Sequence, residues 1–247
     1  HPWSARVARA MIPPPSAIRR PPSCIVALDV PSLAAGRALV DRLGDAADFY
    51  KVGLQLYTAE GPRVIEWLRG AGKRVFLDLK LHDIPQTVRS AAQSAAALGV
   101  RLLTVHASGG AAMLRAGVEG GGDTVGILGV TVLTSMTQGD LESARGHAVQ
   151  SVAAEVARLA DVAAASGAHG IVCAGAEVPA VRAAHAGLHT LVPGIRLGGT
   201  PAHDQERVMT PRDAAAAGAS YLVLGRTVTA AADPMAALRA VLADLGE

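Results

Sequence analysis

The sequence is poor in lysine. Only three of its 247 residues are of this type, Lys51, Lys73 and Lys80, whereas the other 20 basic residues are arginine. A composition rich in arginine and alanine can reflect coding bias alone, so the scarcity proves nothing by itself. A residue type avoided elsewhere is nevertheless of interest where it remains. Lys73 precedes a predicted strand next to Arg74 and is expected only to solvate the surface.

Aromatic residues and an excess of one charge are also missing. The chain has seven aromatic side chains and a formal net charge of +2. Nucleic-acid-binding surfaces need concentrated positive charge, and single-stranded sites also need rings on which bases stack. The composition therefore argues against a nucleic-acid partner.

Long apolar runs and cysteine pairs are scarce as well. The longest stretch free of Asp, Glu, Lys and Arg is 124–139, which has 16 residues and includes three glycines. About 18 consecutive apolar residues indicate a membrane span, so no membrane association is predicted. Cys24 and Cys173 each lie inside an apolar run and are predicted to be buried free thiols, which favours a reducing, cytoplasmic setting.

Residues 1–22 form a leader rich in proline, with Pro13, Pro14, Pro15, Pro21 and Pro22. The leader lacks the apolar segment of a signal peptide. We expect it to be poorly ordered. Because the chain starts with His1 and not with Met, we also expect part of it to come from an expression vector or a processed start.

From residue 23 to residue 247, β-rich runs alternate with amphipathic stretches rich in Ala and Leu, which predicts a single domain. The predicted strands are Cys24–Val30, Asp48–Gly53, Arg74–Leu79, Arg101–His106, Val125–Val132, His169–Ala174, Thr190–Pro193 and Tyr221–Gly225. Short apolar runs between helices are typical of parallel strands buried on both faces. Eight such units predict an α/β fold, the (β/α)8 TIM barrel, whose active sites lie at the C-terminal ends of the strands.

An open, doubly wound sheet is the alternative topology. Its dinucleotide fingerprint is a glycine-rich turn after the first strand. The residues at that place are Asp29-Val30-Pro31-Ser32. The fingerprint is missing, which favours the barrel.

Acidic and basic residues alternate at the ends of three consecutive predicted strands. Asp78 and Lys80 end the third strand, where residues two apart share a face and point toward the barrel axis. Asp29 closes the first strand and Lys51 lies in the second. Buried charges are costly unless they are paired, so this array predicts a shared polar site. A purely structural ion pair is the alternative for Asp78 and Lys80.

Glycine and arginine follow the last two predicted strands, as Pro193-Gly194-Ile195-Arg196 and as Gly225-Arg226. Glycine lets an anion approach the backbone closely, and arginine offers a fork that matches phosphate. Barrels often bind phosphate after strands seven and eight, so we predict a phosphate site here. The alternative for either turn is a C-capping glycine beside a surface arginine.

Other catalytic motifs are missing. The histidines include no His-Glu-x-x-His pair, so His82 and His106 are predicted to be structural and hydrogen-bonded, and no metal site is predicted. Gly120-Gly121-Gly122 is not followed by Lys-Ser or Lys-Thr and indicates a turn. No Gly-x-Ser-x-Gly elbow for a serine nucleophile is present.

Together the strand ends resemble those of the orotidine 5'-monophosphate decarboxylase family, which makes UMP in the last step of pyrimidine synthesis. The similarity runs from about Ser23 to Asp244, and its most specific part is segment 78–87, Asp-Leu-Lys-Leu-His-Asp-Ile-Pro-Gln-Thr. The supporting motifs are Leu28-Asp29, Tyr50-Lys51-Val52-Gly53, Leu133-Thr134-Ser135, Pro193-Gly194-Ile195-Arg196, Asp204-Gln205 and Leu224-Gly225-Arg226.

The resemblance implies catalytic roles for the charged array. Lys80 protonates C6 of the pyrimidine as carbon dioxide departs, and Asp78 lies against the substrate carboxylate. Lys51 completes the array and contacts the ribose together with Asp29, while Thr134 meets the base.

The resemblance also implies a phosphate site and an assembly. The phosphate is held by Arg196, Gln205, Gly225 and Arg226. Asp83 and Thr87 reach into the site of a neighbouring subunit, where Asp83 is a further catalytic residue. The family is a homodimer and uses neither a metal nor an organic cofactor.

Two other functions stay open. A magnesium-dependent sugar-phosphate decarboxylase or aldolase of the same superfamily shares Asp-x-Lys-x-x-Asp but binds its metal with acidic residues, whereas Lys51 would repel a metal. The second alternative function is that of a nucleotide-binding barrel without catalytic activity. Segment 197–203 matches the family least closely, because His203 stands where many members have a glycine before Asp-Gln.

Overall fold

The computed structural model describes residues 21–198 and 209–246, and its strands form one closed ring. The strands are β1 (Ser23–Ala27), β2 (Phe49–Gly53), β3 (Arg74–Leu81), β4 (Leu102–His106), β5 (Gly126–Val130), β6 (Gly170–Val172), β7 (His189–Val192) and β8 (Tyr221–Leu224). Each strand pairs in parallel with the next, and β8 pairs with β1. The predicted single-domain (β/α)8 barrel is confirmed.

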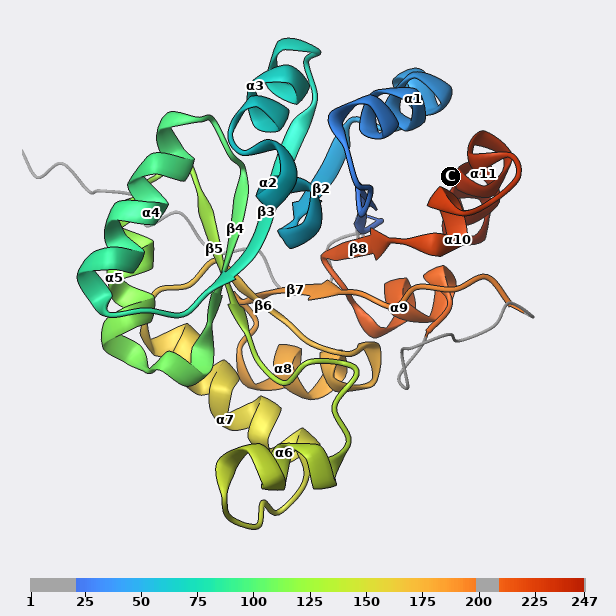
Figure 1. The fold of residues 1–247 in the computed structure, drawn as a ribbon. Coiled ribbons are helices and arrows are strands. Elements are labelled where there is room, and N and C mark those ends of the chain that lie inside the picture. Colours follow the sequence, from blue (N-terminus) through green and yellow to red (C-terminus); the bar gives the residue numbers. More distant parts are fainter. Residues whose placement is uncertain (1–20, 199–208, 247) are drawn as a thin grey trace, which may run out of the picture.

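Helices surround the ring of strands (Figure 1). The α-helices are α1 (Leu33–Leu43), α2 (Leu54–Glu60), α3 (Arg63–Gly70), α4 (Pro85–Ala97), α5 (Ala111–Gly121), α6 (Gln138–Arg145), α7 (Val152–Ala165), α8 (Val178–Ala184), α9 (Pro211–Ala217), α10 (Arg226–Thr229) and α11 (Pro234–Leu245). Short 3-10 turns occupy Gly44–Ala46, Ala107–Gly109 and Gly175–Glu177. None of the described helices combines the length and hydropathy needed to cross a membrane.

Local sequence signals explain where several helices begin. The Ser32 hydroxyl accepts from the Ala35 N–H at the start of α1, and the Ser151 hydroxyl does the same for α7 through Ala154. Thr137 forms a reciprocal capping box at α6 with the third helical residue. Such caps satisfy N–H groups that have no partner within the helix.

Two apolar clusters fill the molecule, as the alternation of side chains along the strands requires. The smaller cluster fills the inside of the ring with Ile25, Ala27, Phe49, Phe76, Leu102, Leu128, Leu191 and Val223. The larger cluster lies between strands and helices and takes the alternate strand residues, such as Leu77 and Leu103. Burying a large apolar side chain contributes roughly 1.5–3 kcal/mol. The ring is therefore a packed core whose carboxyl end is left for chemistry.

The ends of two strands differ from the predicted ones. β1 ends at Ala27, and one further bond runs from the Leu28 N–H to the Lys51 carbonyl. Asp29 therefore does not close the first strand but stands two residues beyond it. β3 continues past its predicted end to Leu81.

Lys73 corrects another expectation. Its ammonium is not simply solvated, because it donates to the carbonyls of Gly44 and Ala47 at 2.8 and 3.0 Å. Only 12% of its side chain is exposed. Lys73 thus ties the turn before β2 to the start of β3. The leader 1–22 lies outside the described residues except for its last two positions.

Candidate active site

A cavity of about 380 Å³ opens at the carboxyl ends of the strands. Its lining comes from β1, β2, β3, β5, β6, β7 and β8 or from the segments just after them. The lining residues are Ala27, Asp29, Lys51, Phe76, Asp78, Lys80, Val130, Val132, Leu133, Thr134, Val172, Leu191, Pro193, Gly194, Arg196, Val223, Gly225, Arg226 and Thr229. The volume falls in the range of small-molecule sites, and the position is the one that barrels use for catalysis.

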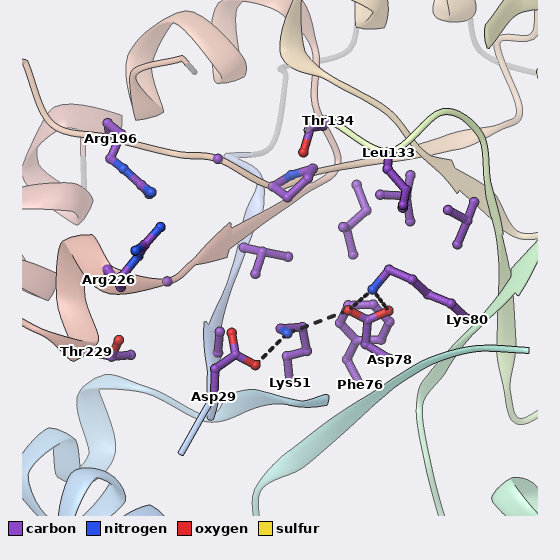
Figure 2. Close-up of a pocket in the computed structure, with 18 of the residues that line it drawn as sticks. Asp29, Lys51, Phe76, Asp78, Lys80, Leu133, Thr134, Arg196, Arg226 and Thr229 are labelled. Carbon is purple, nitrogen blue, oxygen red and sulfur yellow. Dashed lines mark hydrogen bonds and ion pairs between the residues drawn. The ribbon is translucent and has the colours of Figure 1, made fainter. Parts of the chain in front are cut away.

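Four charged side chains form a continuous array on one side of the cavity (Figure 2). The Lys51 ammonium lies 2.8 Å from Asp29 Oδ1 and 3.6 Å from Asp78 Oδ2. The Lys80 ammonium lies 2.8 Å from both carboxylate oxygens of Asp78. The sequence-predicted array is therefore assembled, with acidic and basic groups alternating.

Asp78 is the buried centre of this array, with 8% of its surface exposed. Burial by itself opposes ionisation of the carboxyl group, but the charges of Lys80 and Lys51 and the hydrogen bonds from Lys80 and Thr104 outweigh it. The pKa of Asp78 consequently lies below its ordinary value. Asp78 is an anion at neutral pH.

The backbone at Lys80 departs from strand geometry. Its φ of 49° lies in the left-handed region that disfavours residues with a side chain. At this point the pairing of β3 with β4 shifts, so that Leu77 faces Leu103 but Leu81 faces Val105. The Lys80 N–H donates to the Thr104 hydroxyl at 2.9 Å. The ammonium position in the site thus depends on an irregular strand end.

Two arginines lie on the other side of the cavity. The side chains of Arg196 and Arg226 approach the same space from the segments after β7 and β8 (Figure 2). Arg196 is only 6% exposed, and its Nε has no hydrogen-bond partner among the described residues. Burial and the charge of Arg226 lower the pKa of Arg196. An anion bound here would relieve the repulsion and satisfy the buried donor.

Apolar residues separate the two charged groups. Phe76 lies beside the Lys–Asp array, and Leu133 approaches the cavity from the segment after β5, next to the polar Thr134 (Figure 2). A ligand that fills the cavity therefore meets ammonium and carboxylate groups at one end and guanidinium groups at the other. Further apolar lining comes from Val130, Val172, Leu191 and Val223.

Most of the predicted site residues are brought together in this cavity. The structure places there Asp29, Lys51, Asp78, Lys80, Thr134, Arg196, Gly225 and Arg226. Asp83 and Thr87 are exposed and do not line the described part of the cavity. The Asp83 carboxylate accepts from the Ile84 N–H at the start of α4. Gln205 and positions 199–203 of the 197–203 loop lie outside the described residues.

Sequence reasoning missed some residues of the site. Thr104, which donates to Asp78 Oδ1 at 2.9 Å, was not predicted. It stands two residues after the inward-facing Leu102, so the period of two along β4 was an available signal. Thr229 also lines the cavity, but it lies in the helical turn after Gly225, where no strand period applies.

His82 and His106 were predicted to be structural and to have hydrogen bonds. The two rings lie beside one another near the array, with centroids 5.5 Å apart. Burial, followed by the nearby His82 and Lys80, lowers the pKa of His106. Neither ring is among the described residues that line the cavity. In the whole described part of the chain, no group of three His, Cys, Asp or Glu side chains is placed so that it could hold a metal ion.

The closed ring with a charged cavity at its carboxyl end defines a (β/α)8-barrel enzyme. A family model described as "Orotidine 5'-phosphate decarboxylase / HUMPS family" matches residues 22–241. The orotidine 5'-phosphate decarboxylase of Anaeromyxobacter dehalogenans is 50% identical over 220 residues, 89% of this chain and 96% of the relative. That of Pseudomonas aeruginosa is 46% identical over 226 residues, 90% and 97% of the two chains.

Solved structures agree with these relatives. The crystal structure of orotidine 5'-phosphate decarboxylase from Lactobacillus acidophilus matches with a TM-score of 0.81 and 35% identity, over 92% of this chain and all of that one. The chain belongs to the orotidine 5'-phosphate decarboxylase / HUMPS family. The resemblance seen in the strand-end motifs is confirmed.

Proposed function

We propose that the protein decarboxylates orotidine 5'-monophosphate to UMP, the last step of pyrimidine synthesis, without a metal or an organic cofactor. The activity is that of the relatives at 46–50% identity, which are orotidine 5'-phosphate decarboxylases. The observation that carries the mechanism is the Lys80 ammonium, which lies 2.8 Å from both oxygens of an ionised, buried Asp78 inside the cavity.

Lys80 is the proposed proton donor. When the bond from C6 to the carboxylate breaks, carbon dioxide leaves and the electron pair stays on C6 in an orbital that the ring π system cannot delocalise. A fixed ammonium stabilises this carbanion electrostatically and then transfers a proton to C6. The resulting neutral amine regains its proton from solvent. Lysine suits this step because a guanidinium group holds its protons too tightly.

Asp78 has two roles in this proposal. It holds the Lys80 ammonium in an ion pair at 2.8 Å, and it repels the substrate carboxylate in the ground state. That repulsion disappears when the carboxylate leaves as neutral carbon dioxide, so the interaction differs between ground state and transition state. Only such differential interactions accelerate the chemical step.

Lys51 and Asp29 bind the sugar and close the array. The Lys51 ammonium lies between the carboxylates of Asp29 and Asp78. Asp29 is the more exposed of the two acids, with 57% of its side chain accessible, so it can exchange solvent for ribose hydroxyls. Thr134 lies across the cavity, where the base is expected.

Arg196 and Arg226, with the backbone of Gly225, bind the phosphate in this proposal. The Nε of Arg196, which has no hydrogen-bond partner in the part of the chain that the structure describes, and the repulsion between the two guanidinium groups support a dianion at this place. Gln205 is the fourth proposed phosphate ligand. Phosphate binding far from C6 supplies energy that holds the base against the charged array.

We further propose a homodimer in which Asp83 and Thr87 of one subunit complete the site of the other. Both residues are exposed on the rim of the same barrel end. The neighbouring Ile84 is 67% exposed, and Leu54, after β2, is 57% exposed. Large exposed apolar side chains next to a site favour coverage by another chain. We also propose a cytoplasmic location, because the sequence has only two cysteines and so offers no disulfide framework.

Loss of orotidine 5'-monophosphate, followed by absorbance with and without EDTA, tests the function. Turnover that EDTA leaves unchanged is expected. Turnover abolished by EDTA and restored by magnesium favours the metal-dependent relatives, although Lys51 occupies the space between the two acids where a cation would lie. Tight binding of UMP without turnover identifies a silent nucleotide-binding barrel.

A further inference from the structure

Thr104 connects the backbone of Lys80 to the carboxylate of Asp78. It lies in β4, none of its surface is exposed, and its hydroxyl accepts from the Lys80 N–H at 2.9 Å. The same hydroxyl donates to Asp78 Oδ1 at 2.9 Å. A hydroxyl has one proton to give. Thr104 donates it to Asp78 and accepts a hydrogen bond from Lys80. Thr104 is not among the described residues that line the cavity.

At the irregular end of β3, the Thr104 side chain provides a hydrogen-bond acceptor for the backbone. Phe76 and Leu77 pair with Leu102 and Leu103, but the next paired residues are Leu81 and Val105. Between these paired positions β3 therefore holds two more residues than β4. The hydroxyl of Thr104 therefore serves as the acceptor for the Lys80 N–H in place of a strand carbonyl.

The backbone conformation of Lys80 needs such support. Lys80 is the only residue other than glycine with a positive φ in the part of the chain that the structure describes. A left-handed conformation costs roughly 1–2 kcal/mol for a residue with a Cβ, and strain of this kind persists only where surrounding contacts determine it. A buried hydrogen bond to the strained N–H is one such contact.

We infer that Thr104 is a positioning residue for decarboxylation: its hydroxyl holds the Lys80 backbone and the Asp78 carboxylate in the relative arrangement that places the ammonium in the cavity. The inference rests on the proposed function of Lys80 and Asp78. Thr104 acts through these residues and touches no substrate.

The loss of the hydroxyl has two predictable consequences. Valine has nearly the shape of threonine, so packing in β4 is retained while the Lys80 N–H loses its acceptor. Asp78 loses one hydrogen bond that favours its charged form, so the pKa of Asp78 rises relative to the wild type. The fall of kcat at low pH, where Asp78 becomes protonated, is then expected at a higher pH than in the wild type.

The experiment compares Thr104→Val, Thr104→Ser and Thr190→Val with the wild type. Thr190 is a matched control, because it is also a fully buried strand threonine but its hydroxyl has no partner among the described residues. For each protein, kcat and KM for orotidine 5'-monophosphate are measured across pH, and the thermal unfolding midpoint is recorded. Thr104→Ala is a second hydroxyl-free variant in case valine is not accommodated.

We expect Thr104→Val to lower kcat about 10- to 100-fold, as small displacements of catalytic groups do. KM stays within about threefold because no substrate contact is removed. Thr104→Ser restores kcat to within about threefold of the wild type, and Thr190→Val leaves it unchanged. The kcat loss in Thr104→Val is accompanied by the shift of the low-pH fall of kcat to higher pH.

A kcat of Thr104→Val within about twofold of the wild type overturns the inference, and so does an equal loss in Thr104→Ser. The same holds if Thr104→Ala, used in its place, keeps wild-type kcat. A wild-type protein that does not consume orotidine 5'-monophosphate refutes the proposed function instead. That result is obtained before any variant is compared, so the two failures are distinguishable.

Discussion

Lys80 and Asp78 are two residues apart on one strand, and the ammonium of Lys80 contacts both carboxylate oxygens of Asp78 at 2.8 Å. The left-handed backbone at Lys80 and the bulged end of β3 accompany this contact. Because Asp78 is buried and ionised, it holds the Lys80 ammonium at the cavity wall. The ion pair therefore fixes the position of the Lys80 ammonium before a ligand arrives.

Lys80→Ala is expected to lower kcat at least about 1000-fold, because the variant loses both the proton donor and the charge that stabilises the carbanion. UMP formation is measured directly. Lys73→Ala is the matched lysine control: it removes two hydrogen bonds to carbonyls, so it costs about 1–2 kcal/mol of stability and leaves kcat unchanged. Near-wild-type turnover of Lys80→Ala would refute its assignment.

Arg226→Ala is expected to weaken binding of orotidine 5'-monophosphate roughly 10- to 100-fold, as expected for a lost charge-assisted hydrogen bond to phosphate. Binding of the phosphate-free nucleoside changes far less. KM for the nucleotide and the inhibition constant of orotidine measure the two effects. Arg115→Ala, an exposed arginine of α5, is the control. Equal losses for nucleotide and nucleoside contradict the phosphate role.

Mixed dimers test whether Asp83 acts across subunits. Lys80→Ala and Asp83→Ala are each expected to be nearly inactive alone. When the two variants are refolded or exchanged together, each mixed dimer contains one site with Lys80 from one subunit and Asp83 from the other. About a quarter of wild-type activity per subunit is expected from random mixing of a symmetric dimer. No regain of activity on mixing places Asp83 in its own subunit's site or outside any site.

His169 is expected to make stability depend on pH. Its ring shares a hydrogen bond with the Tyr221 hydroxyl at 2.9 Å and stacks on His189 with centroids 4.3 Å apart. Burial, with the charges of His189 and Arg101, lowers the pKa of His169 to about 4. Since the unfolded chain binds this proton near pH 6.5 and the folded one does not, stability falls as pH drops from about 6.5 to about 4.

His169→Gln removes this dependence. Between pH 7 and pH 4.5 the variant is expected to lose about 1–2 kcal/mol less unfolding free energy than the wild type, a figure discounted for partial exposure. Urea denaturation at both pH values measures it. His147→Gln, at an exposed position after α6, supplies the reference. The prediction is wrong if both variants lose as much stability as the wild type.

The sequence by itself determined the barrel and most of the site. Eight short apolar runs separated by amphipathic stretches predict a (β/α)8 barrel, and its parallel strands bring their carboxyl ends to one face. The sequence alone therefore groups Asp29, Lys51, Asp78 and Lys80, even though Asp29 stands beyond its strand. The period of two along a strand was enough to aim Asp78 into the ring.

Only the tertiary structure decided how Lys80 is held. The two extra residues of β3 between Leu77 and Leu81 arise from its pairing with β4, and no local sequence pattern around Lys80 predicts them. Thr104 lies 24 residues from Lys80, and Lys73 reaches carbonyls 26 and 29 residues away. Such contacts depend on inter-strand register and close packing. Local sequence specifies which elements form, whereas the closed ring decides which side chains meet.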